Sequence, residues 1–242
     1  MWHIAKYEAT SLFSLRPYNA TTSGGKTLVT PTPFAFKMAL LDVAIRTYGF
    51  QIGQKDFPFI RDLKIAIKLP RHLVVNNTFI KILRPYKGGK ARDQFGTGLE
   101  GKMGNTIAYR ELVYFGASLE IAVKSEEEEP PEFSLDKLFS QVNYLGKRGG
   151  FMQFEGVYHT DSLPLAFTLL TPKTEAPFSA YGLLQMLDDC GPKMTFDHAD
   201  IYNKKSIGLN KANGRILKPV VLPYRSIKSS RGFTLYERIS HV

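Results

Sequence analysis

The order in which strand-like and helix-like patterns follow one another constrains the fold of this chain more than any other feature. The pattern reads strand, helix, strand, strand, helix, strand, over Met1–Thr10, Phe34–Thr47, Phe57–Leu69, Ile107–Val123, Leu135–Gly146 and Phe151–Tyr158. Two β-α-β halves in this order predict a ferredoxin-like α+β domain. RNA-recognition modules use the same topology.

The periodicity of apolar residues supports these elements. In the first helix, Phe34, Met38, Leu41 and Ile45 recur at helical spacing, so we expect them to face a core. Over Phe57–Leu69 and Ile107–Val123, apolar residues alternate instead, which is typical of half-buried strands. Gly116 interrupts the second of these segments and could mark a bulge.

The last third of the chain lies outside this pattern. We expect residues 1–160 to form the ferredoxin-like domain and residues 161–242 to form a β-rich C-terminal extension. The extension holds apolar runs at Leu165–Leu170 and Phe233–Tyr236 and a candidate short helix at Ala180–Leu187.

A glycine-rich basic stretch, Arg84–Asn105, separates the second and third strand regions. It contains six glycines and five basic residues against two acidic ones, and it has no apolar period that could face a core. Loops of this length inside a domain are usually functional or disordered. Cations on a glycine-rich backbone suit the phosphates of a nucleic acid, and Phe95 offers a ring for base stacking. A disordered, solvated loop is the alternative interpretation.

The charge of the chain points in the same direction. The formal net charge is +10, and nine of the last forty residues are basic against one acidic residue, Glu237. Such a charge indicates a nucleic acid or another anionic partner. Cys190 is the only cysteine, so the sequence predicts no disulfide, no metal site and no cofactor, and it fits a reducing cytoplasm. We expect no membrane-spanning segment, because no apolar run is long enough.

Three ordered motifs carry a resemblance to a known family. The first is the entry to the first helix, Thr30-Pro31-Thr32-Pro33, which follows an arginine-containing loop. The second is the strand segment Thr106–Val123 with its Arg-Glu-apolar pattern, and the third is Leu135–Phe151, a helix with a glycine-basic exit. The three motifs span about residues 1–158, and together they resemble those of the CRISPR-associated protein five family of Cascade-type surveillance complexes. The Thr-Pro-Thr-Pro entry departs from a clean proline run, and this leaves the subtype open.

This resemblance implies a function for the chain. Members of the family bind the five-prime handle of the CRISPR RNA and cap one end of the backbone subunits, and one branch of the family also cuts its own repeat RNA. We expect this chain to bind the handle without cutting it. They carry an inserted β-hairpin, the thumb, at the position that Arg84–Asn105 occupies here. The implied partners are therefore the guide RNA and the backbone and large subunits of a Cascade-type complex, with target DNA as a further candidate.

The residue types predict which side chains would face RNA. We expect cations to bind phosphates and aromatic rings to stack on bases. The predicted RNA-facing residues lie in four places: Arg16, Tyr18 and Lys26 in the N-terminal loop, Lys37 at the first helix, Arg84, Lys87, Lys90, Arg92, Phe95 and Lys102 in the thumb, and Lys147 and Arg148 after the second helix. A solvated surface cation is the alternative for each charged residue, and packing in a turn is the alternative for Tyr18.

Two other functions stay open. A metal-independent endoribonuclease that processes repeat RNA would need a base and a cation, and His72 or His159 with nearby lysines could supply them. No spacing in the sequence brings these groups together, and the Asp197–Asp200 segment (Asp-His-Ala-Asp) is better explained by a structural or surface role. An unrelated basic protein, for example one bound to the ribosome, is the third possibility.

Overall fold

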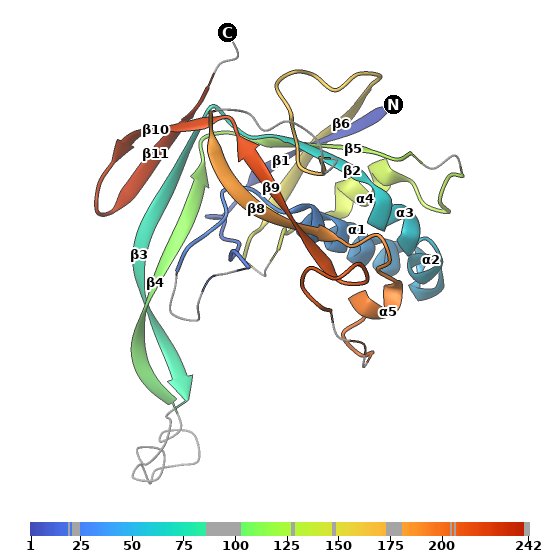
Figure 1. The fold of residues 1–242 in the computed structure, drawn as a ribbon, viewed down its shortest axis with the longest axis horizontal. Coiled ribbons are helices and arrows are strands. Elements are labelled where there is room, and N and C mark those ends of the chain that lie inside the picture. Colours follow the sequence, from blue (N-terminus) through green and yellow to red (C-terminus); the bar gives the residue numbers. More distant parts are fainter. Residues whose placement is uncertain are drawn as a thin grey trace.

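The fold was analysed in a computed structural model. It describes the chain except residues 19, 21–24, 86–102, 127–128, 147–148, 173–180, 204, 206 and 240–242. The described part combines helices with antiparallel sheets (Figure 1), as the sequence predicts at this coarse level.

The main sheet has the strand order β6-β1-β5-β2-β7, and each neighbouring pair is antiparallel. Its strands are β1 (Trp2–Ala9), β2 (Lys64–Lys68), β5 (Leu119–Lys124), β6 (Met152–Thr160) and β7 (Thr168–Leu169). Both faces are covered. Trp2, Ile4, Ala66 and Ala122 form a small core that packs against Leu163, Phe167 and Leu169, so the chain after β6 closes the face opposite the helices.

Four helices cover the other face of this sheet (Figure 1). They are α1 (Pro33–Tyr48), α2 (Phe50–Lys55), α3 (Phe57–Asp62) and α4 (Leu135–Gln141). Thr32 is the N-cap of α1, because its hydroxyl oxygen accepts a hydrogen bond from the Ala35 amide. The buried Tyr7 hydroxyl of β1 donates to the Phe139 carbonyl of α4 at 2.9 Å, which fixes α4 against the sheet.

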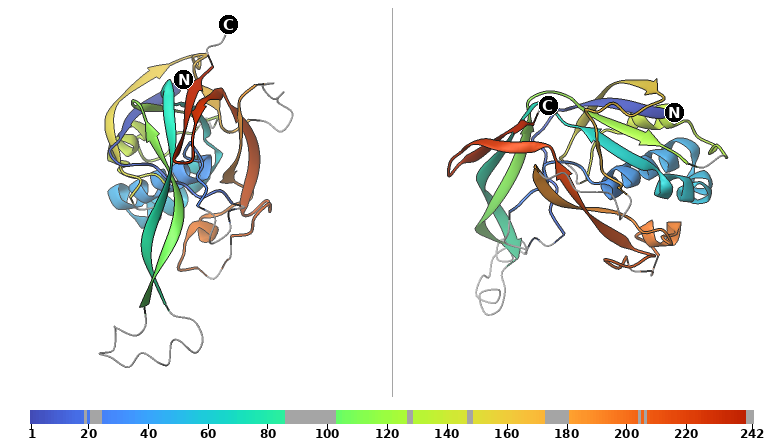
Figure 2. Two further views of the ribbon diagram at one scale, coloured as in Figure 1. Left: turned by 90° about the vertical axis from the view of Figure 1, so that its left-hand side faces the viewer. Right: turned by 45° about the horizontal axis from the view of Figure 1, so that its top comes forward.

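A long hairpin projects from the body (Figures 1 and 2). It consists of β3 (His72–Pro85) and β4 (Met103–Phe115), paired in continuous register from Leu73–Phe115 to Pro85–Met103. Strands β10 (Tyr224–Ser229) and β11 (Phe233–Arg238) add to its base and give the order β10-β11-β3-β4. The C-terminal part of the chain therefore supports the root of the hairpin.

A second ribbon from the C-terminal part lies beside α1. It is formed by β8 (Leu183–Cys190) and β9 (Arg215–Leu222), and α5 (Phe196–Ala199) lies in the connection between them. Leu187 and Leu222 are buried in the main hydrophobic core together with Leu40 of α1. The ribbon thus belongs to the same core as the helices.

Several predicted boundaries were wrong, although α1 is confirmed at nearly its predicted limits. The segment Phe57–Leu69 is not one strand, because its first half is α3, in which Phe57 and Ile60 are buried at helical spacing. The segment Ile107–Val123 is two strands in different sheets. It breaks at Gly116, whose amide donates to the His72 carbonyl at 3.1 Å.

Two further predictions also need correction. Strand β2 is not half-buried, since Ile65, Ala66 and Ile67 are all buried in the centre of the sheet. The part of the candidate helix Ala180–Leu187 that is described begins strand β8, which pairs with β9 from Leu183–Leu222 onward. No helix in the described ranges combines the length and apolarity needed to cross a bilayer.

Candidate nucleic-acid interface

The N-terminal loop between β1 and α1 lies on the root of the projecting hairpin. Phe13 and Val113 of β4 exchange two backbone hydrogen bonds of 2.9 and 2.7 Å. The loop then doubles back, because the Leu28 amide donates to the Leu15 carbonyl at 2.8 Å, and the Glu111 amide donates to the Gly25 carbonyl at 2.6 Å. Both limbs of the loop are therefore held by backbone contacts.

A buried carboxylate reinforces this contact. The side chain of Glu111 is only 8% exposed, and it accepts hydrogen bonds from the Lys26 ammonium at 2.7 Å and the Thr27 amide at 3.0 Å. The hydrogen bond to Glu111, and then the charge of the same carboxylate, raise the pKa of Lys26. Lys26 nevertheless keeps 73% of its side chain exposed, so it can still face a ligand.

A substitution at Gly25 tests the contact between the N-terminal loop and β4. A Cβ atom at this position would lie 2.1 Å from the Tyr109 carbonyl oxygen, which is backbone and cannot rotate away. We expect Gly25→Ala to push the loop off β4 and to lower the melting temperature by several degrees, about 1–3 kcal/mol in stability. Gly156→Ala is the matched control, because a Cβ there meets nothing within 4 Å. Equal melting temperatures for the two variants, measured by differential scanning fluorimetry, would contradict the contact.

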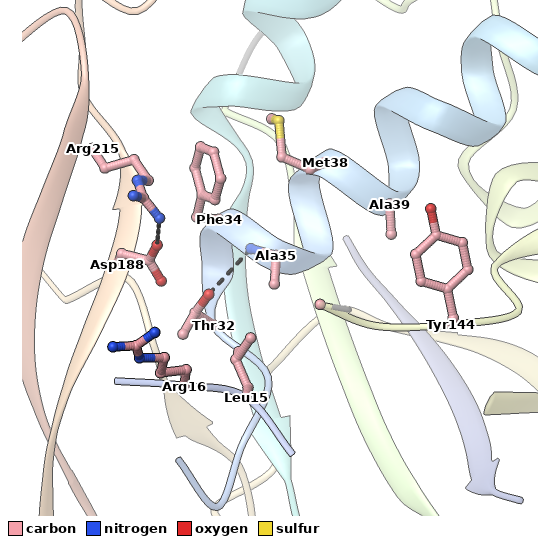
Figure 3. Close-up of a pocket in the computed structure, with 11 residues that line it drawn as sticks. Leu15, Arg16, Thr32, Phe34, Ala35, Met38, Ala39, Tyr144, Asp188 and Arg215 are labelled. Carbon is pink, nitrogen blue, oxygen red and sulfur yellow. Dashed lines mark hydrogen bonds and ion pairs between the residues drawn. The ribbon is translucent and has the colours of Figure 1, made fainter. Parts of the chain in front are cut away.

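A cavity of about 250 Å³ opens between this loop, the start of α1 and the β8–β9 ribbon (Figure 3). Arg16 and Leu15 come from the loop, and Asp188 and Arg215 come from the ribbon. The wall on the α1 side and the chain after α4 complete the lining with Thr32, Phe34, Ala35, Met38, Ala39, Tyr144 and Gly146. In Figure 3, Arg16, Asp188 and Arg215 lie near the start of α1, and Tyr144 lies farther along this helix, beside Ala39.

The charges of the cavity favour an anionic ligand. Arg215 pairs with Asp188 at 3.1 Å and lies over the Phe34 ring, 5.2 Å from its centroid. Its Nε atom is buried and has no hydrogen-bond partner among the described residues. Arg16 is exposed and donates to the Ala20 carbonyl. Two arginines against one carboxylate leave positive charge, while Phe34, Met38 and Tyr144 offer surfaces on which a planar ring can pack.

The predicted RNA-facing residues divide into those that the structure leaves exposed, those that lie outside the described residues, and Lys37, which is buried. Arg16, Tyr18, Lys26 and Arg84 are exposed. Tyr18 is 49% exposed, which disfavours the interpretation that it packs in a turn. The other predicted cations of the thumb and of the exit from the second helix, with Phe95, fall outside the described residues: Lys87, Lys90, Arg92, Phe95, Lys102, Lys147 and Arg148.

The prediction for Lys37 was wrong. Its side chain is 2% exposed, and its ammonium lies 2.6 Å from the Asp189 carboxylate and 2.6 Å from the Arg61 carbonyl oxygen. Lys218 contacts the other oxygen of Asp189 at 3.2 Å. A cation in the first turns of a helix needs a nearby anion, and the protein itself supplies that anion. Lys37 therefore holds the β8–β9 ribbon against α1 and is not available to RNA.

Three features of this surface were not predicted from the sequence. Tyr144 and Asp188 line the cavity, yet nothing in their local sequence distinguishes them. Phe79 and Tyr109, opposite each other on the hairpin, have ring centroids 5.4 Å apart, and Phe79 is 74% exposed. Alternating apolar residues normally predict a buried face, so exposure of this pair could be found only in the tertiary structure.

The two histidines considered for RNA cleavage lie in different places. His72, at the start of β3, lies 3.5 Å from Glu237 of β11. His159, near the end of β6, lies 2.9 Å from Asp136 of α4. Each of the two histidines therefore lies beside a carboxylate.

Comparison with known proteins confirms the resemblance that the motifs indicate. The CRISPR-associated protein Cas5 of Archaeoglobus fulgidus is 24% identical over 200 residues, which cover 81% of this chain and 82% of that protein. A crystal structure of a CRISPR protein from Archaeoglobus fulgidus aligns with a TM-score of 0.47 and 11% identity, covering 99% of this chain and 92% of that one. A chain of a CRISPR RNA-guided surveillance complex aligns with a TM-score of 0.36 and 12% identity, covering 91% and 90%. No family model matches the chain.

Proposed function

We propose that this chain is a Cas5-type subunit of an RNA-guided CRISPR surveillance complex, where it binds the five-prime handle of the guide RNA without cutting it. The proposal rests chiefly on the cavity that Arg16, Arg215 and Tyr144 line between the N-terminal loop, the start of α1 and the β8–β9 ribbon. Sequence similarity to a Cas5 protein over four fifths of the chain supports it. The net charge of +10 favours the same class of ligand.

The strand order supports a ferredoxin-like domain over residues 1–160. The two β-α-β units are β1-α1-β2 and β5-α4-β6. Their strands alternate in the sheet order β6-β1-β5-β2, and each neighbouring pair is antiparallel. The hairpin of β3 and β4 is inserted between the second and third strands of this unit, and we assign it to the thumb. Its described strands extend beyond the predicted range 84–105, most of which lies outside the described residues. We assign residues 161–242 to an extension whose strands support the thumb and α1.

The described contacts suggest how such a subunit would hold single-stranded RNA. Arg16 would pair with a phosphate, and the Phe34 and Tyr144 rings would pack against a base turned into the cavity. The contact between Glu111 and the loop keeps Arg16 in place before RNA arrives. A pre-positioned loop loses less conformational entropy on binding. Backbone and large subunits of the complex remain the proposed protein partners.

Reversing three thumb cations tests the proposal. We expect Lys87, Lys90 and Arg92 changed together to Glu to weaken binding of a labelled handle RNA about tenfold or more. The slope of log affinity against log salt should fall by about 2, because each single-strand phosphate contact contributes about 0.7. Fluorescence anisotropy over a salt series measures both quantities.

The matched control reverses three exposed cations elsewhere on the surface, Lys6, Arg46 and Lys55, which pair with Glu155, Asp42 and Glu132. It removes the same charge and should keep the slope. An unchanged slope in the thumb variant would refute a role of the thumb in RNA binding. Cleavage of repeat RNA in the absence of metal would contradict the non-catalytic role and would favour the endoribonuclease function.

A further inference from the structure

Two histidines and an aspartate meet at one end of the main sheet. His3 Nδ1 lies 2.9 Å from Asp136 Oδ1, and His159 Nε2 lies 2.9 Å from Asp136 Oδ2. The imidazole rings are 4.6 Å apart in an edge-to-face arrangement. One potential ligand atom from each residue lies within 4.8 Å of the other two. The sequence predicts no metal site, because the three residues belong to three distant elements.

The fold dictates this meeting. His3 and His159 are directly opposite in the antiparallel pairing of β1 with β6, so their side chains share one face of the sheet. Tyr7 lies on the same face of β1, and its hydroxyl reaches the Phe139 carbonyl of α4. The shared face is therefore the one that α4 covers. Asp136 is in the first turn of α4, after the N-cap Ser134, and so lies over the histidine pair.

We propose that His3, Asp136 and His159 form a binding site for a divalent transition-metal ion, with zinc as the expected occupant. Two imidazole nitrogens and one carboxylate oxygen are a ligand set found in zinc sites that keep an open coordination position. Magnesium and calcium prefer oxygen ligands alone. The three side chains are 26%, 34% and 38% exposed, which lets water complete the coordination shell.

Binding requires a small adjustment. Zinc lies about 2.0–2.2 Å from nitrogen and oxygen ligands, so the ligand atoms around a tetrahedral ion are about 3.4 Å apart. The ligand atoms of the cluster lie within 4.8 Å of one another, so side-chain rotation must shorten the widest separation by up to about 1.4 Å. In the structure, each imidazole nitrogen donates its N–H to a carboxylate oxygen of Asp136 at 2.9 Å. The ion takes the place of these protons, which are released or move to the outer ring nitrogens, and no oxidation or reduction is involved.

An ion in this position would join β1, the edge strand β6 and α4. Because it binds only the folded chain, it raises the melting temperature. At a free zinc concentration a hundred times the dissociation constant, we expect a rise of about 5–10 °C. This consequence does not depend on RNA binding.

The experiment uses the full chain without a histidine tag, treated with a chelator and then dialysed. Isothermal titration with zinc chloride should show one ion per chain, and thermal unfolding should show the stabilisation. His3→Gln, Asp136→Asn and His159→Gln should each weaken zinc binding at least tenfold, which lowers the shift in melting temperature at the same zinc concentration to about half or less. Circular dichroism of the metal-free variants verifies that they fold.

His72→Gln is the matched control, because His72 is another partly exposed histidine beside a carboxylate, Glu237. It should bind zinc like the unchanged chain. Cobalt(II) provides a second readout, since its visible spectrum reports nitrogen and oxygen coordination and should change in the three site variants alone. Absence of zinc binding, or equal binding by the unchanged chain and the folded site variants, would overturn the proposal.

Discussion

Replacing Lys37 by methionine lowers the free energy of unfolding by about 3–5 kcal/mol, the usual cost of breaking a buried ion pair by removing one partner. The Lys37 and Asp189 side chains are 2% and 5% exposed. Without the ammonium, Asp189 keeps its contacts with Lys218 and the Cys190 amide but loses its closest cation. Urea unfolding followed by tryptophan fluorescence and circular dichroism measures the change.

Two further variants separate the loss of the ion pair from the loss of packing. Lys37→Met combined with Asp189→Leu removes both charges and should recover most of the stability, because apolar replacements of buried pairs are often neutral. Arg46→Met removes a cation that pairs with Asp42 on the exposed side of the same helix, and it should cost about 0.5 kcal/mol or less. A double variant as unstable as Lys37→Met would show that the charge left on Asp189 is not the cause of the destabilisation.

Replacing Glu111 by alanine should have the second largest effect, and it should affect both stability and RNA binding. The change leaves the buried Thr27 amide without its partner and frees Lys26, at a cost of about 2–3 kcal/mol. The loop that carries Arg16 then loses its side-chain contact with β4. We expect handle RNA to bind about tenfold more weakly, because the loop must be ordered on binding.

Glu111→Gln provides the graded comparison. Its amide oxygen can still accept one of the two hydrogen bonds. The loss of stability and the loss of RNA-binding free energy should therefore each be about half as large as in Glu111→Ala. Hydrogen exchange at the Leu28 amide, which bonds to the Leu15 carbonyl, reports whether the loop has opened. If Glu111→Ala weakens RNA binding without faster exchange at the Leu28 amide, then Glu111 does not act on RNA binding by ordering the loop.

Helix α1 shows what local pattern can predict. Its apolar spacing and its proline entry lie within one short segment, and the structure ends the helix within one residue of each predicted limit. Strand β8 shows the opposite case. Leu183, Leu184 and Leu187 have a spacing that suits a helix, yet the segment pairs with β9, whose first residue is Arg215. A strand is stabilised by a partner that a window of sequence does not contain.

The candidate interface divides in the same way. Arg16, Tyr18, Lys26 and Arg84 are polar or amphipathic residues in loops or on the hairpin, and the structure leaves them exposed. Lys37 is also a cation, but its side chain faces the core. There it pairs with Asp189, which lies 152 positions later in the chain. Charge alone therefore predicts a basic surface, but it does not tell which cations are already paired.

Four features of this chain follow from the amino-acid sequence alone: its net charge, its first helix, the position of the inserted basic stretch and the resemblance to the CRISPR-associated protein five family. Each is a property of composition or of neighbouring residues. Three others became known from the folded chain: Lys37 is buried, Arg16 and Arg215 border one cavity, and His3 meets Asp136 across 133 positions. The physical reason is that packing and pairing of charges depend on distance in space, and residue spacing carries that information only within a single helix or strand.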